Sequence, residues 1–92
     1  MSGVAPKKWM VPKDRQLEWR EWGGLSVVYN PASGDTHLLN AVSALVLMSL
    51  ERNASTIEEI EVLVSDSGAP SGNVAALVSE LDELGLIAPA QP

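Results

Sequence analysis

The histidine His37 is the side chain of this sequence best suited to acid–base or phosphotransfer chemistry, because imidazole titrates near neutral pH. It is the sole histidine, and the chain has no cysteine. One histidine cannot by itself build a zinc site or a Ser-His-Asp triad. We therefore interpret His37 as a strand histidine that hydrogen-bonds locally. A small phosphotransfer carrier that uses His37 is kept as an alternative.

Two other groups of residues could take part in binding. The acidic cluster Glu58-Glu59-Ile60-Glu61 lacks the ligand spacing of a calcium loop, and it is typical of the solvated face of a helix. Trp19 and Trp22 are separated by an odd number of positions in an expected strand, so they lie on opposite faces of it. We expect Trp19 in the core and Trp22 as an exposed contact. No metal site and no cofactor is expected.

Composition disfavours several classes of function. The 92 residues carry 12 acidic and 6 basic side chains, a formal charge of −6. Nucleic-acid binders are usually basic over their contact surface. The longest apolar stretch, residues 38–50, is shorter than the roughly 20 residues that span a bilayer. We expect a cytoplasmic protein with no nucleic-acid and no membrane partner.

The first half of the chain predicts strands. From residue 17 apolar and polar side chains alternate, and residues 25–30 contain good strand formers. Gly23-Gly24 and residues 31–34 have the composition of turns. Residues 35–39 form a third strand, so the expected product is a three-stranded antiparallel meander.

The second half of the chain predicts three helices. Asn40 is the expected N-cap of a buried helix over residues 41–50. Residues 55–58 (STIE) read as a capping box for a second helix. A third helix is expected from residue 71 to residue 84, closed by Gly85 with Leu86 against Leu81 in a Schellman motif.

This order predicts an α+β, winged-helix-like fold, β-β-β-α-α-α. We expect a flexible basic N-terminal arm over residues 1–14, in which residues 9–11 can add a short strand. The folded domain is placed at residues 15–88 and a C-terminal tail at residues 89–92. A winged helix often reads DNA with its third helix, but here that helix has no Lys or Arg and ends in three acids.

The last strand of the meander, residues 35–39, could bind a peptide instead of DNA. An edge strand exposes unpaired N–H and C=O groups, which are a template for another strand. An extended peptide can pair there and place alternate side chains against the third helix. The competing interpretation is that the apolar stripe of this helix belongs to the core.

The order of several segments resembles the PqqD-like family. These segments are Val27-Val28-Tyr29, Leu39-Asn40, residues 55–60 (STIEEI) and residues 80–87 (ELDELGLI). Val28-Tyr29-Asn30 followed by residues 33–39 (SGDTHLL) is similar, more narrowly, to the PqqD-like members of HPr-rel-A gene systems. The resemblance covers about residues 17 to 87.

The resemblance implies a recognition element for ribosomally made, post-translationally modified peptides. In that family a leader peptide adds as a strand beside the third strand, rests against the third helix, and is presented to a separate modifying enzyme. Transferred by position, the peptide-binding residues are Asp35, Thr36, His37, Leu38, Val74, Leu77, Val78 and Leu81. The element itself is not an enzyme.

The sequence departs from that family at the groove. Many such elements hold acidic leaders with basic side chains, but this third helix has none and Asp35 adds negative charge. Either the peptide is neutral or basic and held by apolar anchors, or the groove has lost the task. An alternative from another class is a regulatory module that docks a kinase-like partner through its acidic helices. Both a monomer and a homodimer stay open.

Overall fold

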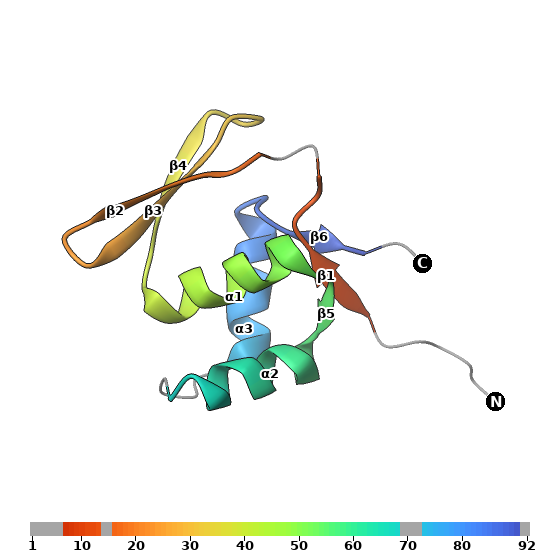
Figure 1. The fold of residues 1–92 in the computed structure, drawn as a ribbon. Coiled ribbons are helices and arrows are strands. Elements are labelled where there is room, and N and C mark those ends of the chain that lie inside the picture. The colour runs from red at the N-terminus through yellow and green to blue at the C-terminus, as the bar shows by residue number, and fades with distance from the viewer. Residues whose placement is uncertain (1–6, 14–15, 69–72, 91–92) are drawn as a thin grey trace.

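The computed structural model describes residues 7–13, 16–68 and 73–90. A three-stranded antiparallel sheet, the meander, is followed by three helices, which confirms the predicted α+β class and the order β-β-β-α-α-α (Figure 1). The elements are β1 Lys8–Met10, β2 Glu18–Trp22, β3 Leu25–Asn30, β4 Asp35–Leu39, α1 Ala41–Arg52, β5 Ser55–Thr56, α2 Ile57–Asp66, α3 Val74–Glu83 and β6 Ala88–Pro89.

The register of the meander decides which side chains share a face. The strand order is β2-β3-β4, so β2 and β4 are its edges. Trp19 lies opposite Val28, and Val28 lies opposite His37. Val28 is fully buried, because this face of the sheet covers α1. The residues next to Trp19, Val28 and His37 in each strand belong to the opposite face, which points away from the helices and is called the outer face.

The helices supply most of the core. α1 packs against β3, β4 and α2, and α2 packs against α3. The largest fully buried side chains are Leu47, Leu50, Ile60, Leu81, Leu86, Ile87, Val28, Val46, Val64 and Val78. In the part of the chain that the structure describes, no helix has the length and apolarity to cross a membrane.

Two of the predicted helix ends are confirmed. The Asn40 side chain accepts a hydrogen bond of 2.8 Å from the backbone N–H of Ser43, so it caps α1. At the end of α3 the N–H of Leu86 donates to the carbonyl of Leu81 at 3.1 Å, and Gly85 has φ +77°. This is the predicted Schellman closure, and the positive φ explains the glycine.

The start of the second helix differs by one residue from the prediction. The capping box is formed by Thr56 and Glu59, not by Ser55 and Glu58. Ser55 instead lies in β5 and pairs with Trp9 of β1, and the helix begins one residue later than predicted. The third helix begins at Val74 with Asn73 as N-cap, and residues 71 and 72 of the predicted helix lie outside the described residues.

A second small sheet, in the order β5-β1-β6, includes residues of both the predicted arm and the predicted tail. The expected short strand is present as β1, but residues 8–11 belong to the folded unit because Trp9 and Val11 are buried. Pro89 pairs with Trp9, and the N–H of Ala90 donates to the carbonyl of Lys8 at 2.8 Å. The first residues of the predicted tail are therefore part of the fold too.

Candidate functional site

The outer edge of β4 is the part of the meander best suited to pair with another strand. β4 pairs with β3 on one side, and no strand among the described residues pairs with its other side. Its sole charged residue is Asp35, at its first position. The opposite edge strand, β2, carries Glu18, Arg20 and Glu21. Charges on an edge strand oppose pairing, so β4 is the more permissive edge.

The four predicted site residues on β4 are divided between the two faces of the sheet. Asp35 lies opposite the buried Asn30, and His37 lies opposite the buried Val28, so both belong to the face toward the helices. Thr36 and Leu38 belong to the outer face, and Leu38 is 59% exposed. Only one half of the predicted strand site therefore faces the helices.

His37 contains a buried polar atom without a partner. Its Nε2 atom is inaccessible to solvent and makes no hydrogen bond to any described residue. The expected local hydrogen bond is therefore not found at this atom. A buried polar group that makes no hydrogen bond costs roughly 1–3 kcal/mol.

A cavity of about 240 Å³ lies where β4 ends. Its walls come from the residue that follows β4, from the beginnings of α1 and α3, and from α2. The lining residues are Asn40, Val42, Ser43, Val64, Asn73, Val74 and Leu77. Val74 and Leu77 were predicted for the site, whereas the other lining residues were not. Their signal in the sequence was the capping residues, since Asn40 and Asn73 mark the two helix starts that meet here.

The other two predicted residues of α3 are in the core. Val78 and Leu81 are each 1% exposed, whereas Leu77 is partly buried at the edge of the core. The apolar stripe of α3 thus serves two purposes. Its first turn lines the cavity and its remainder holds the helices together.

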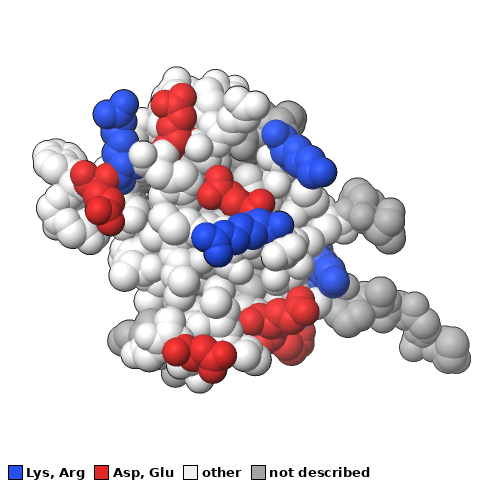
Figure 2. All heavy atoms as spheres, viewed as in Figure 1, with Lys and Arg blue, Asp and Glu red and all other residues white. Residues whose placement is uncertain are grey.

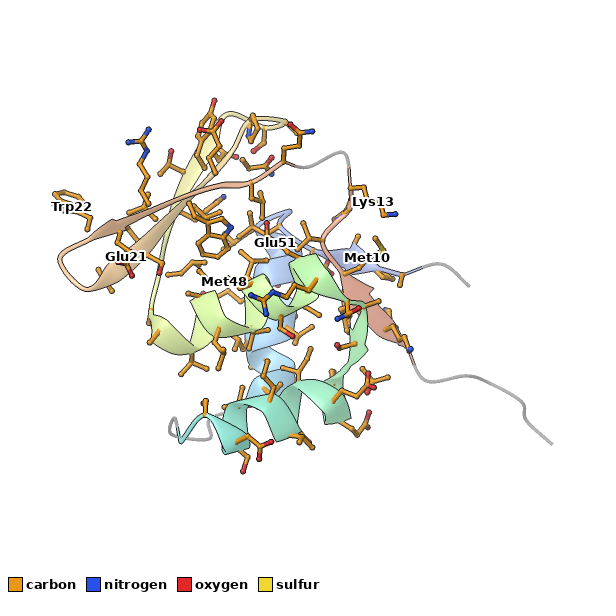
Figure 3. The ribbon with its side chains drawn as sticks, viewed as in Figure 1. Met10, Lys13, Glu21, Trp22, Met48 and Glu51 are labelled. Carbon is orange, nitrogen blue, oxygen red and sulfur yellow. The ribbon has the colours of Figure 1, made fainter. Side chains whose placement is uncertain are left out.

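Trp19 and Glu51 connect the meander to α1. The indole Nε1–H of Trp19 donates to Oε1 of Glu51 at 3.0 Å. Partial burial raises the pKa of Glu51, although the hydrogen bond from Trp19 acts in the opposite direction. Figure 3 shows Glu51 on the side of α1 that faces the sheet and Trp22 at the far tip of the β2–β3 hairpin. Trp22 is 74% exposed, as the alternation predicted.

Negative charge is concentrated on α2 and α3. α2 carries four acids and α3 carries three, and neither helix has a basic residue. Acidic side chains are visible over α2 at the bottom of Figure 2. Within the described ranges, no three acidic or histidine side chains gather as metal ligands.

Comparison with protein-family models, with curated proteins and with solved structures gives no match for this chain. The geometry of the β4 edge and of the cavity is therefore the basis for a functional proposal.

Proposed function

We propose that this protein binds an extended peptide as an additional strand on the free edge of β4. The observation that carries the proposal is the continuity of that edge with the cavity, since Asn40 directly follows β4 and lines the cavity. A peptide on β4 that continues past Leu39 would place a side chain at the cavity mouth. The proposed role is an adaptor that presents a precursor peptide to a separate modifying enzyme in the cytoplasm.

Main-chain hydrogen bonds would supply affinity that depends little on the sequence of the peptide. In strand addition the backbone pairs with the sheet edge, and pockets for alternate side chains give specificity. β4 has five residues, which is close to the usual strand length of about 5–6 residues.

The cavity would supply specificity for one aliphatic side chain. Sites for drug-sized ligands measure roughly 300–1,000 Å³, so a cavity of about 240 Å³ is better matched to a single side chain. Val42, Val64, Val74 and Leu77 give it an apolar wall, while Asn40 and Asn73 direct their side-chain oxygens to backbone N–H groups. We expect a branched aliphatic residue as the anchor.

Charge favours a neutral or basic peptide. Asp35 is the charged residue of the β4 edge, and α3 carries acids at its C-terminal end and no base. An acidic peptide would be repelled on approach. This preference separates the proposed site from elements that hold acidic leaders with basic side chains.

The test is selection of short peptides from a displayed random library, followed by NMR titration of the isotope-labelled protein with synthetic copies of the strongest binders. We expect amide shifts concentrated in residues 35–39 and 73–77. Leu77→Asp should weaken binding at least about tenfold, because it places a charge at the wall of an apolar cavity. The matched control is Val62→Asp on the exposed side of α2, which should leave affinity unchanged.

Circular dichroism of both variants separates loss of binding from loss of folding. Binders that shift neither segment would contradict the proposal. A complex that shifts α2 and weakens strongly with added salt would instead support docking on the acidic helices. Strand addition anchored by an aliphatic side chain should change much less with salt.

A further inference from the structure

The outer face of the meander carries an exposed apolar patch. The register places Trp22, Leu25, Tyr29 and Leu38 on this face, and their exposed fractions are 74%, 42%, 37% and 59%. Val27 lies between them and is partly buried. Seven large apolar side chains are exposed in the described residues, and these four share one face. Such clustering is typical of an interaction surface rather than of scattered surface residues.

Charge distinguishes this face from the rest of the molecule. Its charged residues are Glu18 and Arg20, which cancel. The seven acids of α2 and α3 account for more than half of the 12 acids in the chain. Figure 1 shows the meander at the opposite end of the molecule from α2. Two copies that meet through their meanders therefore keep their α2 helices apart, which limits repulsion between two chains of charge −6.

We propose that the outer face of the meander binds the same face of a second copy. Glu18 and Arg20 are two residues apart on β2, so they project from the same face about 7 Å from each other. A two-fold axis that crosses the strands between them brings Glu18 of each copy opposite Arg20 of the other. The same operation brings Tyr29 opposite Val27 of the other copy. The contact is thus complementary in charge at β2 and apolar where Tyr29 meets Val27, while Leu38 lies opposite Thr36.

The size of the patch predicts a weak dimer. The four exposed apolar side chains present on the order of 400 Å² per copy. Two such patches bury less than the roughly 1,200 Å² of the smallest stable interfaces. We therefore expect a dimer that forms at high protein concentration and dissociates on dilution.

Sedimentation equilibrium over a range of protein concentrations tests the proposal. The apparent mass should rise above the monomer mass of 9.8 kDa as the concentration increases. Leu25→Asp should return the protein to a monomer at every concentration, because it buries a charge in the apolar contact. The control is Val62→Asp, which places the same charge on an exposed apolar position outside the face.

Charge reversal tests the arrangement itself. Arg20→Glu and Glu18→Arg should each weaken association about tenfold, and the double variant that exchanges the two residues should recover it. Thermal unfolding of each variant verifies the fold. A wild-type protein that stays monomeric at about millimolar concentration overturns the proposal, as does association that Leu25→Asp leaves intact. Peptide binding at β4 does not involve Leu25, so its success or failure is a separate result.

Discussion

Both faces of the meander carry large apolar side chains, but their surroundings are very different. The face toward the helices carries Val28 and Leu39, which are 0% and 4% exposed. The outer face carries Tyr29, which follows Val28 in the sequence, and Leu38, which precedes Leu39. These two side chains are 37% and 59% exposed. Burial is therefore set by what covers each face, and not by the hydrophobicity of its residues. The uncovered face is the one that stays available for a partner.

Leu38 and Leu39 test this difference most directly, since they are the same residue type at adjacent positions of β4. Leu39→Ala should lower the free energy of unfolding by about 3 kcal/mol, because it removes a buried side chain and leaves a cavity. Leu38→Ala should change it by no more than about 0.5 kcal/mol. Urea denaturation followed by circular dichroism measures both.

The comparison fails if the two variants are equally destabilised. In that case the outer face is covered in solution, and repeating the denaturation at several protein concentrations shows whether a second copy covers it. A midpoint that rises with concentration for the wild type but not for Leu38→Ala would assign the cover to the proposed dimer.

The alternation of the strands was predicted from the sequence, and the covered face was chosen by placing Trp19 in the core and Trp22 outside it. Trp19 and Val28 on one face are matched by Val27 and Tyr29 on the other, so periodicity alone allows either face to be the core. The placement of Trp22 at the exposed tip succeeded because it follows Trp19 by an odd number of positions. The division of the predicted β4 site between two faces follows from the same alternation.

Other features depend on contacts between distant segments. β5 and β6 have two residues each, which is too short for any periodic signal, and they pair with the two sides of β1, which is distant from both in the sequence. The cavity likewise forms where the beginnings of α1 and α3 meet. The Asn40 cap of α1 and the closure of α3 at Gly85 were predictable, because the hydrogen bonds of each join residues only a few positions apart.

Trp19 and Trp22 provide the next comparison, because they are the same residue type on opposite faces of β2. Trp19→Phe removes the hydrogen bond to Glu51 and should cost about 1 kcal/mol. Trp22→Phe should leave stability unchanged, because this ring is 74% exposed. Urea denaturation of the two variants measures the difference, and an equal loss in both would show that the hydrogen bond does not stabilise the sheet against α1.

Glu51 gives the smallest expected effect, a pH dependence on the covered side of the sheet. Burial raises its pKa above the ordinary value of 4.5, so in the folded state it keeps its proton to higher pH than in the unfolded chain. At pH values just above about 4.5, the folded state therefore binds more protons at this site than the unfolded chain does. Because of this difference, the contribution of Glu51 to stability falls as pH rises through that window. Glu51→Gln cannot ionise, so its stability relative to the wild type should increase over the same pH range and then level off. Urea denaturation at a series of pH values measures this difference, with Glu61→Gln on α2 to account for the change in net charge. A constant difference across the series would mean that ionised Glu51 is fully solvated, and that the contact between β2 and α1 opens in solution.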